Sequence, residues 1–317
     1  MSVPIASSAG TVRLAALECA ASCAVSALAI RGMDPRGFLL GYWHIAYYDG
    51  MLMSAKNIKW IDLAYEYGVS ATFTSGSPEN LRELIDDGDM AIVLCTASKL
   101  SFFPPSMLGF ESAGFYHCVL LHRRGERPDS YLVVDPVADY AGETTEQELT
   151  EASVRAGQFV YCRLSFDSSY RRPSARESFL KEAAANLASY EKSGAAAFES
   201  FRSYAADFET WDAATRLAWA DRNAIALSAL IRMRTLVWQS YEDTGLLTVD
   251  ELEEGRSKLG DVVRAWMSIN LLFVKIGRRV SAGGHAEPLA RLTIAAEQAE
   301  MRLLAYLAAR ELIPNEN

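Results

Sequence analysis

The chain has 317 residues, half of them hydrophobic, and a formal net charge of −9. This length exceeds the usual size of one domain, so we expect two domains. The composition excludes nucleic acid as a partner. Phosphate binding needs a basic surface, and the chain has no run of Lys or Arg longer than two residues.

The cysteines argue against a structural framework of disulfides or zinc. All five lie within residues 1–165, an odd number without a CxxC pair: Cys19, Cys23, Cys95, Cys118 and Cys162. We therefore expect no metal, no bound cofactor and a reducing cytoplasm. The apolar stretch 14–30 contains Glu18, and no longer apolar run occurs elsewhere, so neither export nor a membrane span is expected.

The first half begins with predicted helices. An Ala- and Leu-rich helix is expected over 17–30, where Gly32 can supply its left-handed exit. A second is expected over about 58–67. A third begins at Ser77 and Pro78, because Ser caps a helix and Pro fits its first turn, and ends near residue 88.

The pattern then changes to short β-rich runs separated by turn residues. Strands are predicted over 90–96, 116–122, 131–135 and 159–164. Short connections favour antiparallel pairing, so we predict an α+β domain over residues 1–168 with its helices packed on one face of the sheet.

The second half is predicted to be an all-α helical domain over 174–317. Ser, Arg and Pro concentrate at the boundary, and capping boxes begin at Ser174 and Thr248. Helices are expected at about 175–192, 195–209, 212–243, 249–281 and 286–311. Their apolar faces are wider than single surface helices need, so we expect a homodimer.

Three residues suggest nucleophilic chemistry. Cys23 lies on the first predicted helix, and a thiol near a helix start is activated by the helix dipole and a neighbouring imidazole. His117 lies on a predicted strand, and Asp135 ends the next one. The residues alone leave other roles open: Cys23 as a packing residue, His117 as a buried strand histidine and Asp135 as a turn cap. Cys19, one helical turn before Cys23, is the rival nucleophile.

Several segments resemble the butirosin-biosynthesis protein H family, whose members are similar to C39 peptidases. The segments in chain order are residues 22–28, 32–34, 38–41, 87–94, 115–121 and 131–136. The resemblance implies a papain-like (C39-like) cysteine protease fold with an antiparallel sheet, followed by a helical domain. It implies a triad of Cys23, His117 and Asp135.

The same resemblance implies an acyltransferase or condensing enzyme of natural-product biosynthesis. A thioester on the phosphopantetheine arm of an acyl or peptidyl carrier protein would acylate the cysteine, and an amine or carbon nucleophile of a small-molecule acceptor would take the acyl group. Basic pairs such as Arg123 and Arg124 could dock the acidic carrier.

The acyl donor needs an approach and an oxyanion site. Aromatic residues around Tyr42, Trp43 and Tyr47 could line the approach, although ordinary core packing is the favoured explanation for them. Leu17, six residues before Cys23, has no side-chain donor for an oxyanion. We therefore expect donors at Ser22 or in the loop that ends at His44.

Two alternatives retain this fold. In one, the same triad passes the acyl group to water or to an internal nucleophile, which gives a thioesterase, a peptidase or a cyclase. In the other, the first domain is an inactive protease-like module that binds a partner.

Overall fold

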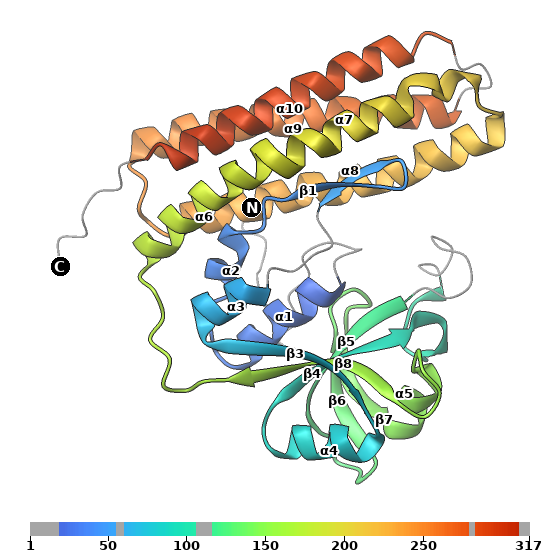
Figure 1. The fold of residues 1–317 in the computed structure, drawn as a ribbon, viewed down its shortest axis with the longest axis vertical. Helices are drawn as coiled ribbons and strands as arrows, with labels where there is room; N and C mark the ends of the chain where they lie inside the picture. Colours follow the sequence, from blue (N-terminus) through green and yellow to red (C-terminus); the bar gives the residue numbers. More distant parts are fainter. Residues whose placement is uncertain (1–18, 55–59, 106–115, 279–282, 311–317) are drawn as a thin grey trace. The chain divides into compact units, whose positions relative to one another are not determined.

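The computed structural model describes residues 19–54, 60–105, 116–278 and 283–310. The chain divides into two compact units (Figure 1). The sheet unit comprises residues 1–38 and 58–172, and the helical unit comprises 39–57 and 173–317. The division after Arg172 falls inside the predicted boundary segment, but residues 39–57 belong to the helical unit and not to a domain over 1–168.

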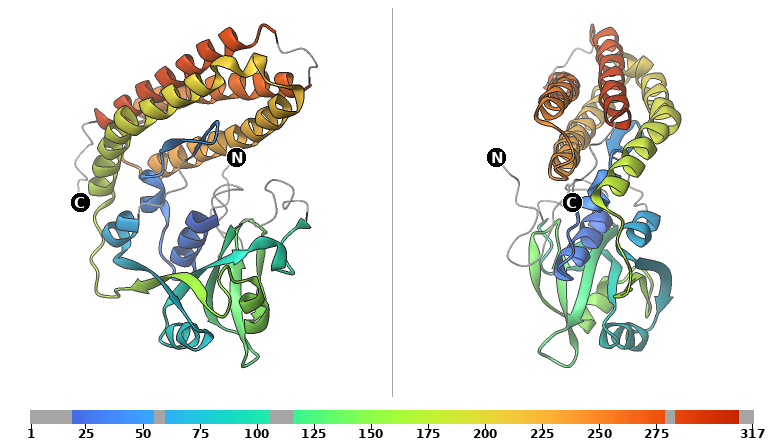
Figure 2. Two further views of the ribbon diagram at one scale, coloured as in Figure 1. Left: turned by 45° about the vertical axis from the view of Figure 1, so that its right-hand side comes forward. Right: turned by 90° about the vertical axis from the view of Figure 1, so that its left-hand side faces the viewer.

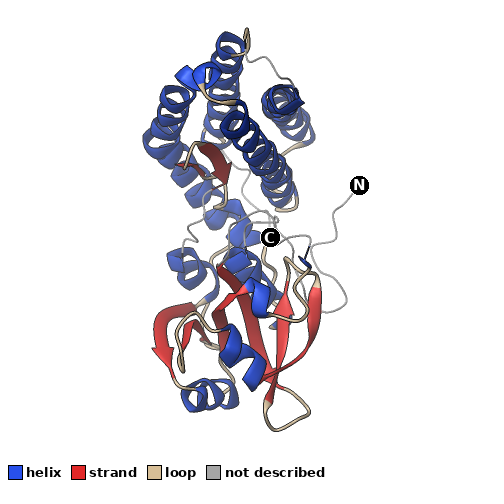
Figure 3. Cartoon of the chain, turned by 90° about the vertical axis from the view of Figure 1, so that its right-hand side faces the viewer, coloured by secondary structure: helices blue, strands red, loops and turns tan. Residues whose placement is uncertain are grey.

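The sheet unit contains a six-stranded antiparallel sheet, so the α+β prediction is confirmed. Its spatial order is β3-β8-β4-β5-β6-β7. The strands are β3 (Val69–Gly76), β4 (Met90–Thr96), β5 (Tyr116–Arg124), β6 (Ser130–Asp135), β7 (Tyr140–Thr145) and β8 (Phe159–Phe166). Figure 3 shows that the strands other than one short hairpin gather in this unit.

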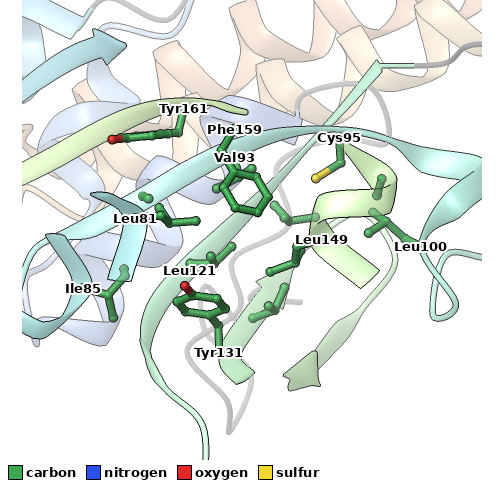
Figure 4. Close-up of a cluster of buried hydrophobic side chains, with 14 of the residues drawn as sticks. Leu81, Ile85, Val93, Cys95, Leu100, Leu121, Tyr131, Leu149, Phe159 and Tyr161 are labelled. Atoms are coloured by element: carbon green, nitrogen blue, oxygen red, sulfur yellow. The ribbon is translucent and has the colours of Figure 1, made fainter. Parts of the chain in front are cut away.

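One face of this sheet is covered by α4 (Pro78–Asp86) and α5 (Glu146–Ala152). Ser77 caps α4 and forms a capping box with Asn80, as a Ser-Pro helix start requires. Alternate residues of the central strands point to these helices and form the core in Figure 4, with Val93, Leu121 and Tyr131 at its centre.

Helix α1 (Cys19–Ile30) packs against β4, β5 and β6. The intervening residues of these strands, Ile92, Leu120 and Val134, are buried as well and point to the face opposite the α4 and α5 cluster. The sheet is therefore buried on both faces, whereas the sequence predicted helices on one. Helix α3 (Trp60–Tyr67) packs on the outer strand β3, and α2 (Arg36–Leu40) spans the division between the units.

The helical unit is built from long helices. These are α6 (Ala175–Ser189), α7 (Ala195–Tyr204), α8 (Ala213–Glu242), α9 (Val249–Arg278) and α10 (Ala286–Ala308). A π-helical turn (Tyr190–Gly194) joins the first two. Among the described residues, no helix combines the length and apolar character needed to cross a membrane.

A two-stranded hairpin of β1 (Ile45–Tyr48) and β2 (Met51–Ser54) completes the helical unit, and Figure 2 shows it beside α8. Asp49 and Gly50 form its two-residue loop, both with positive φ, of 46° and 78°. The Gly50 carbonyl accepts hydrogen bonds from Trp219 Nε1 at 2.7 Å and from Asn223 at 3.2 Å. These bonds fix the hairpin tip to α8, which explains why residues 39–57 belong to this unit.

A buried ion pair lies in the core of the helical unit. Arg234 and Glu300 are fully buried, with Arg234 Nε 2.7 Å from Glu300 Oε1. Trp266 Nε1 donates to the same oxygen at 2.7 Å, and Trp43 Nε1 donates to Oε2. The Arg234 guanidinium also lies 4.8 Å from the Trp43 ring centroid. The carboxylate thus links the segment before the hairpin to three helices.

Replacing Glu300 with Leu should strongly destabilise the helical unit, because it leaves the Arg234 charge buried without its carboxylate. Breaking a buried pair in this way costs about 3–5 kcal/mol. Denaturant unfolding followed by tryptophan fluorescence checks the loss. The double variant Glu300→Leu/Arg234→Met should recover part of it, and a loss below about 1 kcal/mol for the single variant would contradict a central role of the pair.

Candidate active site

His117 and Asp135 form a buried pair on neighbouring strands. His117 lies near the start of β5 and Asp135 at the end of the adjacent antiparallel strand β6. His117 Nε2 is 2.7 Å from Asp135 Oδ2, and both side chains are fully buried. The sequence predicted these two residues as partners, and the structure brings them together.

Both carboxylate oxygens of Asp135 accept hydrogen bonds. Oδ2 bonds the ring of His117, while Oδ1 accepts from the backbone N–H groups of Val137 at 2.9 Å and Ala138 at 3.1 Å. The Phe103 ring packs edge-on against the imidazole, with ring centroids 4.8 Å apart. The ring is thus held in one orientation. Because Asp135 occupies Nε2, Nδ1 is the nitrogen that can exchange a proton with a thiol.

The thiol that meets this imidazole belongs to Cys19. Cys19 is the first described residue of α1 and is partly buried, and its thiol interacts with the Cys118 thiol and with the His117 ring. The hydrogen bond from Cys118 lowers its pKa most and outweighs burial, and the bond to His117 and its charge act in the same direction. The Cys19 pKa is lowered to about 4.

The pKa of His117 moves in the opposite direction. Burial disfavours the charged ring, but the hydrogen bonds to Asp135 and Cys19, with their negative charges, outweigh it and raise the pKa to about 9. These opposite pKa shifts favour a Cys19 thiolate paired with a His117 imidazolium. Such a pair is the activated form of a cysteine nucleophile.

Cys23 has a different environment. It is fully buried, and its Sγ lies 3.5 Å from the carbonyl oxygen of Cys118. Burial raises the pKa of its thiol well above the usual value, with Asp135 and Cys19 adding negative charge nearby. Burial and the raised thiol pKa argue for a packing role of Cys23 and favour the rival Cys19 over the predicted nucleophile.

The side chains of the residues predicted to bind substrate are engaged in packing and hydrogen-bonding contacts. Ser22 is fully buried on α1, and Tyr42 and Trp43 are core residues of the helical unit. His44 Nδ1 is 2.9 Å from Ser189 Oγ, and the Tyr47 ring packs on Tyr204 with centroids 6.2 Å apart. Their alternative role as core, which the sequence left open, is the one that these contacts support.

Other aromatic residues lie close to the reactive pair. Phe102, next to Phe103, stacks on Tyr140 with ring centroids 4.0 Å apart and planes within 5°. Both are partly buried and pack, like Cys19, against the sheet core. Tyr140 follows the turn that begins at Asp135. Sequence patterns did not single out this stack, because its residues come from two segments that only the fold joins.

No family model matches this chain, and no curated protein does. The site is therefore interpreted from its own geometry. Among the residues that the structure describes, no three His, Cys, Asp or Glu side chains are grouped as a metal site. A cysteine beside an imidazole that a carboxylate orients is an arrangement suited to nucleophilic acyl transfer.

The lowered pKa of Cys19 predicts an unusual pH dependence of alkylation. A thiol with an ordinary pKa of about 8.5 loses roughly tenfold in rate for each pH unit below that value. Cys19, with a pKa of about 4, is already a thiolate at mild acid pH, so its alkylation by iodoacetamide should change little between about pH 5 and about pH 8. Peptide mapping of the labelled protein measures this, and a tenfold fall per unit at Cys19 would contradict the ion pair.

Proposed function

We propose that the sheet unit is a papain-like acyl-transfer enzyme in which Cys19 is the nucleophile, His117 the general acid and base, and Asp135 the orienting carboxylate. The observation that supports this best is the buried hydrogen bond between His117 Nε2 and Asp135 Oδ2 at 2.7 Å, together with the partly exposed Cys19 thiol, which interacts with the same imidazole. Burial of His117 and Asp135 keeps water from competing for these bonds.

In the proposed reaction the Cys19 thiolate attacks the carbonyl carbon of a thioester. The tetrahedral intermediate collapses by breaking the bond to the donor sulfur, which takes the proton of the His117 imidazolium and leaves as a thiol. The acyl group is then bonded to Cys19 Sγ. Neutral His117 next removes a proton from the acceptor amine as it attacks, and the released Cys19 thiolate restores the ion pair.

The donor class that we propose is an acyl thioester on the phosphopantetheine arm of a carrier protein, with a small amine or carbon acid as acceptor. Exchange between two thiols is nearly balanced in free energy, so a cysteine thiolate suits such a donor. The resemblance to the butirosin-biosynthesis protein H family supports the same class. The proposal moves the nucleophile of that resemblance from Cys23 to Cys19.

The basic side chains near Arg123 are partly engaged in contacts of their own. Arg124 Nη2 already donates to the Pro128 carbonyl, and Arg127 pairs with Glu143. We therefore do not assign carrier docking to this cluster.

Product analysis with a simple acyl thioester, such as acyl-N-acetylcysteamine, tests the proposed function. We expect an intact-mass increase of one acyl group that disappears on addition of an amine, together with the matching amide. The variant Cys19→Ala should show neither. Absence of an acyl adduct on the wild-type protein with a panel of thioesters would reject the proposal, while release of free acid alone would favour hydrolysis over transfer.

A further inference from the structure

The site contains a second thiol beside the reactive one. Cys118 directly follows His117 on β5, and alternation along the strand points its side chain toward the face that α1 covers. The thiols of Cys118 and Cys19 shift each other's pKa, as expected of neighbouring groups. Neither cysteine is fully buried.

The two elements that hold these thiols are packed together. One turn after Cys19 on α1, the Cys23 thiol contacts the Cys118 carbonyl at 3.5 Å. The same helix face therefore contacts Cys118 twice, once through its backbone and once through its thiol. A disulfide between Cys19 and Cys118 requires the sulfurs to close to about 2 Å with the Cα atoms about 5–6 Å apart.

We propose that Cys19 and Cys118 form a peroxide-sensitive modification site, in which a hydroperoxide oxidises Cys19 and Cys118 resolves it as a reversible disulfide. This goes beyond the proposed function, since it requires a reactive Cys19 but no acyl transfer. It also gives a role to Cys118, which takes no part in the proposed acyl transfer.

The chemistry is balanced with hydrogen peroxide as the oxidant. The Cys19 thiolate attacks one peroxide oxygen, the O–O bond breaks, and the other oxygen leaves as water after taking a proton. Cys19 is then a sulfenic acid. The Cys118 sulfur displaces its hydroxyl, which leaves as water with the thiol proton of Cys118, and the S–S bond forms. Two thiols are oxidised, and one peroxide is reduced to two waters.

The neighbouring cysteines are less suited to this step. Cys23 and Cys95 are both buried, and neither thiol forms a hydrogen bond with Cys19 among the interactions of the described residues. Cys162 lies on β8, two strands away from β5 in the sheet order. Cys118 is thus the resolving thiol that the geometry favours.

Peroxide treatment of the full chain followed by intact mass and peptide mapping tests the site. For the wild type we expect a loss of two hydrogen atoms, a single peptide linking Cys19 to Cys118, and full reversal by dithiothreitol. Cys118→Ser keeps a hydrogen-bond donor but cannot form a disulfide. In that variant Cys19 should instead gain two oxygen atoms as sulfinic acid, which dithiothreitol does not reverse.

Cys95→Ala is the matched control and should behave as wild type. Sulfinic acid at Cys19 of the wild type, a link from Cys19 to another cysteine, or no oxidation at Cys19 would each overturn the inference. The test is separable from the proposed function. Disulfide formation without any acyl adduct rejects acyl transfer alone, and an acyl adduct without the disulfide rejects this inference alone.

Discussion

Cys19→Ala should abolish acyl transfer, whereas Cys23→Ala should leave it within a few-fold of wild type. Removing the nucleophile of a hydrogen-bonded triad lowers kcat by about 10⁴-fold or more. Cys23, one helical turn later, is fully buried with a raised thiol pKa, so its removal changes packing and leaves the reacting atoms in place. Steady-state rates with an acyl thioester and an amine compare the two variants directly.

The variants Cys19→Ala and Cys23→Ala are well matched, because each removes one sulfur atom from a cysteine on the same helix. Thermal unfolding of each variant separates loss of activity from loss of fold. Loss of activity in a folded Cys23→Ala protein, with activity retained in Cys19→Ala, would return the nucleophile to the position that the sequence suggested.

Asp135→Asn should lower kcat by about 10²- to 10⁴-fold with little change in substrate affinity. Both oxygens of Asp135 accept hydrogen bonds, one from His117 and the other from the backbone N–H groups of Val137 and Ala138. An amide has a single oxygen. If that oxygen keeps the turn, the amide NH₂ faces Nε2 and stabilises the neutral ring with its proton on Nδ1, so the imidazolium is lost.

The negative charge of Asp135 also affects the protonation of His117. Together with the hydrogen bond, it raises the His117 pKa against the effect of burial. In Asp135→Asn the alkylation of Cys19 should therefore become strongly pH-dependent, falling as the pH decreases toward 5. Asp139→Asn is the control: it removes one charge from the same turn at an exposed position with φ 55°, which Asn tolerates. Equal losses in both variants would argue against a specific role of Asp135.

The sequence predicted the elements with strong local signals. Strand β4 has the predicted bounds, and capping boxes mark the starts of α4 and α6. The outer strands β3 and β7 were missed. They are rich in Thr, Ser and Gly and mostly lack the alternation of buried apolar residues, because each pairs on one side only. The Asp49-Gly50 hairpin had a recognisable turn signal that was overlooked.

The site was predictable in part. His117 and Asp135 followed from their places on successive antiparallel strands, where short connections bring residues together. The sequence favoured Cys23 over Cys19, which lies one turn earlier on the helix, whereas burial in the structure favours Cys19. Every residue from Ala21 to Leu28 is buried, so periodicity gave no exposed face to orient the helix, and its start could not be fixed from composition. Exposure and the partner of each thiol depend on the packing of α1 on β5.

Locating the acyl group on the chain tests the central claim most directly. The protein would be incubated with a simple acyl thioester, quenched in acid, digested and analysed by tandem mass spectrometry for the modified cysteine. We predict that the acyl group is bonded to Cys19, and that its yield falls sharply in His117→Ala. An acyl group on Cys23, or on Cys19 with a yield independent of His117, would contradict the account.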